Sequence, residues 1–254
     1  MLAAMRLSER VYLVGSGSNG FDLTDPFDCH VYLIDGGSEL ALIDVGAGMG
    51  APAIIENVKR DGLDPARIRH LIFTHAHGDH AGGGARMRKL LGEPATYLSG
   101  VVADSLRRGD EKAISLDVAK LAGIYPDDYH LEPCPIDHEL EEGATIQVGN
   151  LRLAVFDTPG HSDGHVSLLL EDGGQRMLFA GDVIFHGGKV LLQNIHDCRL
   201  DALISSLRKL RHLEITALFP GHLTLSLKDG QRHIERANQV LDRLLVPEQM
   251  VAAW

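Results

Sequence analysis

The chain has 254 residues, of which 44% are hydrophobic and 23% are charged, a composition typical of a globular protein. Its formal net charge of −11 excludes the broad basic surface on which nucleic-acid binding usually depends. No apolar run approaches the roughly 20 residues that span a bilayer, and residues 1–10 show no signal sequence. The three cysteines are widely spaced, so we expect free thiols and a cytoplasmic protein without a nucleic-acid or membrane partner.

The N-terminal part of the chain alternates strand and helix patterns. Short apolar and β-branched runs, separated by glycines, predict strands at residues 10–17, 30–35, 39–46 and 69–74. A helix is predicted over 51–62, because Pro52 stands near its start and Gly62 just past its end. A second helix is predicted over 85–92. Strands that alternate with helices indicate an α/β layered fold.

The middle of the chain is less regular. Residues 99–122 have a helical pattern, and residues 123–143 carry three prolines among acidic and aromatic residues. We interpret the region at about 95–143 as an irregular excursion, because it is too short to build a core of its own. The prediction is therefore one domain over residues 1–254.

Strand patterns resume after this excursion, at residues 144–158, 165–171, 176–182 and 215–222. Helices are predicted at about 200–212 and 227–245. Strand and helix runs thus stand on both sides of the irregular middle. They indicate two similar halves that form one sandwich.

The stretch THAHGDHAGG, residues 74–83, directly follows a predicted strand. In an α/β sheet, ligands bind in the crevice at strand ends. His75 and His77 are two residues apart, so on an extended backbone they point the same way. Asp79 and His80 follow a glycine and can turn towards a second point. Imidazoles suit zinc and iron, and a carboxylate adds a harder oxygen ligand, so this loop can serve two neighbouring metal ions.

Three further candidate ligands follow predicted strands elsewhere in the chain. His161 and His222 each come after a strand and a Pro-Gly turn, and Asp182 ends the apolar run at 176–182. Each signal is weak alone, because a single histidine after Pro-Gly is more often structural. Their shared position at strand ends favours one common site.

The order of these motifs, H-x-H-x-D-H followed by PGH, GD and a second GH, resembles the metallo-β-lactamase-fold hydrolases. The nearest likeness is to the glyoxalase II and lactonase branches. It covers roughly residues 10–225 and includes LIDVG at 42–46. The resemblance implies a four-layer αββα sandwich in a single domain. It also implies two divalent metal ions, with zinc in first place and iron or manganese as alternatives.

The resemblance implies a role for each motif residue. The first metal ion would be bound by His75, His77 and His161. The second would be bound by Asp79, His80 and His222. Asp182 would bridge both ions; true β-lactamases of the superfamily generally lack this carboxylate, which argues against antibiotic hydrolysis. A bridging hydroxide would attack a carbonyl carbon, and Asp79 is the candidate catalytic residue that orients it or moves its proton.

Further residues are candidates for contact with a small-molecule substrate. His186, Lys189 and His196 lie on a glycine-softened loop after Asp182, near the expected pocket. Tyr125 could cover the pocket from the excursion, together with its neighbours Tyr129 and His130. His165 is expected to be structural or to support the ligands.

Several activities remain open at this point. A small lactone or another carboxylic ester is the favoured substrate. A glyoxalase II-like thioesterase of the hydroxyacylglutathione hydrolase type is the alternative. That likeness implies a glutathione-binding domain after His222, whereas only one helix is predicted there. A mononuclear iron persulfide dioxygenase and a catalytically silent binding protein are the alternatives from other classes. The oligomeric state is left open.

Overall fold

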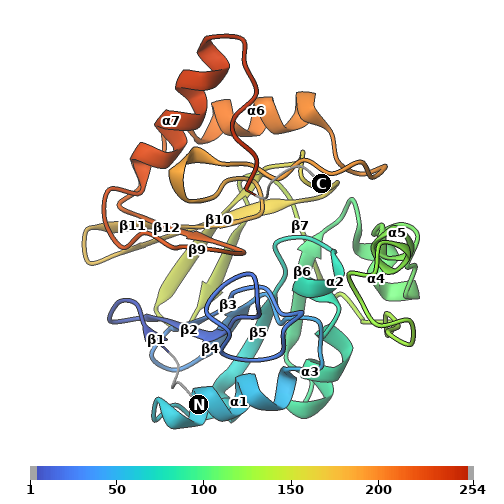
Figure 1. Ribbon diagram of the computed structural model, residues 1–254. Coiled ribbons are helices and arrows are strands. Elements are labelled where there is room, and N and C mark those ends of the chain that lie inside the picture. Colours follow the sequence, from blue (N-terminus) through green and yellow to red (C-terminus); the bar gives the residue numbers. More distant parts are fainter. Residues whose placement is uncertain (1–4, 251–254) are drawn as a thin grey trace.

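The computed structural model describes residues 5–250. Figure 1 shows two β-sheets packed face to face, with α1 and α3 outside one sheet and α6 and α7 outside the other. This arrangement confirms the predicted four-layer αββα sandwich.

Within residues 5–250, the first sheet has seven strands that follow one another in chain order. These are β1 (Met5–Arg6), β2 (Val11–Gly15), β3 (Val31–Asp35), β4 (Leu40–Ile43), β5 (Ile68–Ile72), β6 (Ala95–Ser99) and β7 (His138–Leu140). The strands from β1 to β4 pair antiparallel, and those from β4 to β7 pair parallel. The parallel part aligns the carboxyl ends of β4 and β5 at one edge.

In the part of the chain that the structure describes, the second sheet has five strands in the order β12-β11-β10-β9-β8. These are β8 (Thr145–Val148), β9 (Leu151–Asp157), β10 (Val166–Asp172), β11 (Gln175–Gly181) and β12 (Ala217–Pro220). Pairing is antiparallel except between β11 and β12, which run parallel. The ends of these two strands therefore also share an edge.

The α-helices of the described chain are α1 (Ala51–Arg60), α2 (Gly78–Ala81), α3 (Gly84–Leu90), α4 (Ala103–Arg108), α5 (Leu116–Leu121), α6 (Leu200–Leu210) and α7 (Gln231–Asp242). Two short 3-10 helices are η1 (Pro65–Arg67) and η2 (His186–Gly188). None of the helices within residues 5–250 is long and apolar enough to cross a membrane.

An apolar core separates each pair of layers, because alternate residues of a strand face opposite sides of the sheet. Between the sheets, the ring of Tyr32 lies 5.3 Å from that of Phe179 and 5.5 Å from that of Phe219. Ile54 of α1 packs in the core outside the first sheet, and Leu207 of α6 packs in the core outside the second. Apolar side chains thus fill the space between the sheets and beneath the outer helices.

The middle of the chain differs in detail from its sequence pattern. Residues 99–122, predicted as helical, hold two short helices, because Gly109 ends α4 in a left-handed conformation with φ +64°. The expected excursion at about 95–143 includes β6 and β7, so the part of it outside the sheet is residues 100–137 and the turn at 141–143. The strand β7 has three residues and pairs only with the parallel β6, a contact that local sequence does not reveal.

Candidate metal centre

Four loops bring the seven candidate ligands to one edge of the sandwich. The loop from His75 to His80 follows β5, and His161 follows β9. Asp182 comes directly after β11, and His222 follows β12. The parallel pair β11 and β12 places the loops of Asp182 and His222 side by side, and β9 ends at the same edge. The side chains of all seven residues come together.

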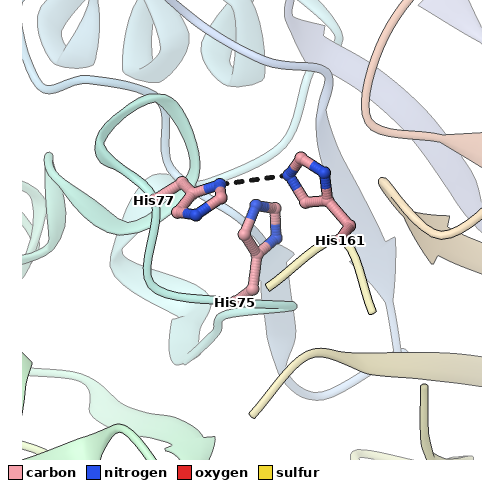
Figure 2. A group of neighbouring side chains, drawn as sticks. All are labelled: His75, His77 and His161. Atoms are coloured by element: carbon pink, nitrogen blue, oxygen red, sulfur yellow. Dashed lines mark hydrogen bonds between the residues drawn. The ribbon is translucent and has the colours of Figure 1, made fainter. Parts of the chain in front are cut away.

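His75, His77 and His161 form the first group of donors, with one ring nitrogen of each within 4.8 Å of the others. Figure 2 shows the ring of His77 facing that of His161, where Nδ1 lies 3.0 Å from Nε2. Nε2 of His75 is buried and has no hydrogen-bond partner among the described residues. Three nitrogens around one point match the histidine ligation of a divalent metal ion.

The second ring nitrogen of each histidine can donate a hydrogen bond away from this point. Nε2–H of His77 donates to Asp197 over 3.0 Å, and Nδ1–H of His161 donates to the Leu191 carbonyl over 3.3 Å. Nδ1–H of His75 donates to the hydroxyl of the preceding threonine over 3.0 Å. Such bonds fix the tautomer, so that each ring keeps a lone pair for a metal ion.

Asp79, His80 and His222 form the second group, again with donor atoms within 4.8 Å of one another. Nε2 of His222 lies 3.0 Å from Oδ2 of Asp79 and 3.4 Å from Nε2 of His80. His80 is fully buried, while about a quarter of the Asp79 side chain is exposed. Asp79 therefore belongs to the cluster and can also meet a bound molecule.

The Asp182 carboxylate lies between the two groups. Its Oδ2 is 3.6 Å from Nε2 of His161 and 3.4 Å from Nε2 of His222. Its Oδ1 is 3.5 Å from Nε2 of His80, yet it is buried and has no hydrogen-bond partner within residues 5–250. A buried carboxylate oxygen without a donor is costly unless a cation or another donor meets it.

Burial and neighbouring charges set the ionisation of the cluster. Burial would raise the pKa of Asp182, but His222 and His80 outweigh it and hold the pKa well below its usual range. Burial lowers the pKa of His161 to about 4. Burial would lower the pKa of His222, but Asp182 and Asp79 raise it to about 9. A metal ion that binds here therefore displaces protons from the histidines nearest the carboxylates.

Asp44 supports His80, a role that sequence reasoning missed. Nδ1–H of His80 donates to Oδ2 of Asp44 over 2.8 Å, and the Thr74 backbone N–H donates to Oδ1 over 2.8 Å. Asp44 is buried and adopts φ +58°, which turns its side chain from the end of β4 towards the loop. The available signal was a carboxylate directly after an apolar strand in LIDVG.

Asp197 supports His77 in the same way and was also missed. Its Oδ2 accepts from His77, and its Oδ1 accepts from the Ser115 hydroxyl over 2.6 Å. Burial would raise the pKa of Asp197, but the bonds from His77 and Ser115 outweigh it and lower the pKa to about 2. An aspartate near the end of a long loop gives no sequence signal of such a contact.

His165 supports Asp182 from behind. Its Nε2 accepts the Asp182 backbone N–H over 3.0 Å, and its Nδ1–H donates to the Thr158 hydroxyl, 2.9 Å away. Gly181 adopts φ +50°, and a Cβ there would lie 2.5 Å from Nε2 of His165. The glycine of the GD motif is thus required where β11 passes close to this imidazole.

A cavity of about 430 Å³ opens onto the cluster. The side of the cavity next to the cluster is formed by His77, Asp79, His161, Asp182 and His222. Its other sides come from the segment 114–125, from the loop after β11, and from Asn19 and Met250. Tyr125, which the sequence suggested could cover the pocket, lines this cavity, and its hydroxyl donates to Oδ1 of Asp79 over 3.3 Å.

The other residues considered for substrate contact lie elsewhere. His196 is exposed, and its Nδ1 is 3.1 Å from the hydroxyl of the serine that precedes α5. The His186 ring packs against His233, with centroids 4.5 Å apart, and Lys189 forms an ion pair with Glu248 over 2.9 Å. None of these three predicted substrate residues lines the cavity.

The neighbours of Tyr125 have different surroundings. Tyr129 is buried, and its hydroxyl lies 2.9 Å from the Ala47 carbonyl and 3.3 Å from the Gly78 carbonyl, so it holds the excursion against the loops that follow β4 and β5. His130 is exposed and lies 3.3 Å from Glu111. Neither residue lines the cavity.

Comparison with known sequences identifies related proteins. The family model for the metallo-beta-lactamase superfamily matches residues 24–222. A hydroxyacylglutathione hydrolase of Rhodopseudomonas palustris (strain BisB5) is 31% identical over 201 residues, which cover 79% of this chain and 63% of that protein. The atrochrysone carboxyl ACP thioesterase of Passalora fulva is 26% identical over 229 residues, 85% of this chain and 56% of that protein. This chain spans less than two thirds of the length of both relatives.

Solved structures with the same architecture include a metallo-beta-lactamase of Cronobacter sakazakii, with a TM-score of 0.72 and 20% identity over 96% of this chain and 97% of that chain. A subclass B3 metallo-beta-lactamase of Bradyrhizobium japonicum also has a TM-score of 0.72 and 20% identity, and covers 96% of this chain and 92% of that chain. At this level of identity the likeness concerns the fold.

Proposed function

The chain belongs to the metallo-beta-lactamase superfamily, and we propose that it is a metal-dependent hydrolase that cleaves a small lactone or another carboxylic ester. The observation that carries the proposal is the cluster of histidine nitrogens and carboxylates at the side of the cavity. Such a cluster can bind the ions that make water a nucleophile. The cavity offers the space in which an ester can meet it.

Two divalent ions fit these residues, and zinc is the ion that we propose. The buried, unpartnered Nε2 of His75 and Oδ1 of Asp182 each need a partner that a cation would supply. We assign the ligands as His75, His77 and His161 for the first ion, Asp79, His80 and His222 for the second, and Asp182 for both. When bound, the ions would act as Lewis acids and would lower the pKa of water towards about 7.

The reaction adds water across the acyl–oxygen bond of the ester. The oxygen of water ends on the carboxylic acid, and one of its protons ends on the alcohol. Asp79 is the residue that orients the attacking water, because its carboxylate borders both the cluster and the cavity. The Tyr125 hydroxyl holds that carboxylate in place.

Thioester hydrolysis is the second candidate, because the relatives named above are a hydroxyacylglutathione hydrolase and an acyl-carrier-protein thioesterase. Glutathione carries carboxylates, and a site for it needs cationic partners. No lysine or arginine is among the residues of the described chain that line the cavity. This observation favours an uncharged ester over a glutathione thioester.

The proposal is tested by metal analysis and by turnover of lactones, simple esters and glutathione thioesters with the same zinc-loaded preparation. We expect two metal ions per chain and hydrolysis of esters or lactones. One iron per chain, with oxygen consumption in the presence of a persulfide, would instead identify a dioxygenase.

The variant Asp182→Ala should lower kcat/KM by more than a hundredfold, beyond the roughly 10–100-fold typical of groups that only support a metal ligand. Asp201→Ala, at an exposed position on α6, is the matched control and should keep full activity. Full activity of the Asp182 variant would contradict the proposed bridging role.

A further inference from the structure

The segment 114–125 gives the cavity an apolar wall. Its residues in the lining include Ile114, Leu116, Val118, Ala119, Ala122 and Ile124. Val118 and Ile124 remain 42% and 49% exposed, although they face a cavity. Covering such apolar surface contributes about 25 cal/mol per Å². An apolar group in the cavity would therefore be stabilised by this wall.

The wall is attached to the metal centre at both ends. Before α5, the Ser115 hydroxyl donates to Asp197, which also binds His77. After α5, Tyr125 donates to Asp79. A molecule whose reacting bond lies at the cluster therefore has the apolar wall directly beside it.

Among the described residues that line the cavity, none outside the metal cluster offers a charged partner to a substrate. Asp79 and Asp182 are the only ionised carboxylates among the described lining residues, and both belong to the metal cluster. The opposite side, formed by the loop after β11, offers Leu191 and Ile195 together with the neutral amides of Gln193 and Asn194. The two sides together suit a slender apolar chain.

We propose that the substrate is an uncharged ester or lactone with an apolar chain of several carbons, and that those residues of the segment 114–125 that line the cavity bind this apolar chain. This assignment rests on the proposed ester hydrolysis and names its substrate class. The apolar chain of the substrate lies between α5 and the loop after β11, and the ester carbonyl lies at the metal cluster.

The first test uses the zinc-loaded full chain and p-nitrophenyl acetate, butanoate, hexanoate and octanoate. Burial of one methylene is worth about 0.8 kcal/mol, so kcat/KM should rise about fourfold per added methylene until the cavity is filled. Equal kcat/KM for all four esters would overturn the chain-binding assignment and leave ester hydrolysis intact. No turnover of any ester would instead contradict the proposed function.

The second test narrows the wall. Ala122 is exposed at the cavity, so Ala122→Trp adds bulk without disturbing the core, and the ratio of octanoate to acetate kcat/KM should fall at least tenfold. Leu121→Trp is the matched control. The Leu121 side chain is next in sequence to Ala122, is 89% exposed and does not line this cavity, so the ratio of octanoate to acetate kcat/KM should not change. Ala119→Leu, a smaller addition in the same wall, should lower the ratio in the same direction. An unchanged ratio in both alanine variants would refute the assignment.

Discussion

Asp28 is a buried carboxyl group that makes the stability of this fold depend on pH. Its oxygens accept hydrogen bonds from the Thr24 hydroxyl over 2.7 Å and from the Ala47 backbone over 2.9 Å. Burial nevertheless dominates and raises the pKa of Asp28 from its usual 3.8 to about 6. The folded protein therefore binds this proton more tightly than the unfolded chain does.

The resulting stabilisation is complete below pH 3.8 and is lost as the pH rises through about 6. We expect the wild type to lose about 2–3 kcal/mol of unfolding free energy relative to Asp28→Asn between pH 4 and pH 7. Urea unfolding of both proteins across this range measures the difference. A difference that does not change with pH would show that Asp28 is ionised with its usual pKa.

At the scale of elements, α5 and the first group of histidines are coupled through one aspartate. Asp197 accepts from His77 and from Ser115, which directly precedes α5. The serine before the helix that lines the cavity and the ring of His77 therefore share one carboxylate. Loss of that carboxylate should weaken metal binding more than it lowers the stability of the fold.

We expect Asp197→Asn to weaken zinc binding about 10–100-fold, as for other groups that orient a ligand histidine. Zinc titration with a competing chelator gives the affinity, and activity should return at high zinc concentration because the proposed ligands themselves remain. Asp201→Asn, exposed on α6, serves as the control and should bind zinc like the wild type. Unchanged zinc affinity in Asp197→Asn would show that the His77 contact has no role in metal binding.

Sequence patterns located those features that are local in the chain. The strand β5 and the loop from His75 to His80 are contiguous, so spacing alone predicted their cluster. The strand-end rule also predicted that His161, Asp182 and His222 would meet that loop, because parallel strands end at one edge.

Features that depend on distant pairing escaped this reasoning. The strand β7 is defined by its partner β6, and Asp197 gains its role from His77, 120 positions earlier in the chain. His186 and Lys189 belong to the loop after β11, part of which lines the cavity. The side chains of these two residues, however, contact α7 and the C-terminal segment. Side-chain direction on a loop is set by tertiary contacts that short-range patterns do not contain.

At the scale of the whole molecule, the metal ions should stabilise the entire sandwich. Free zinc at about a hundred times its Kd would add about 2.7 kcal/mol, which corresponds to roughly 5–10 °C in Tm for a chain of this size. Removal of metal with a chelator should lower Tm by this amount, and added zinc should restore it. Scanning calorimetry with elemental analysis measures both; an equal Tm with and without bound metal would contradict the site.

The proposed ligands come from both halves of the chain: the loop after β5 in one, and the ends of β9, β11 and β12 in the other. Neither half alone holds all the proposed ligands of either ion. A metal ion would therefore bind with its full set of ligands only after the two sheets have packed together. Metal uptake would then report on the last stage of assembly. If the chain is cut between β7 and β8, the two fragments should bind zinc only after they associate. Zinc binding would then measure the association of the two fragments.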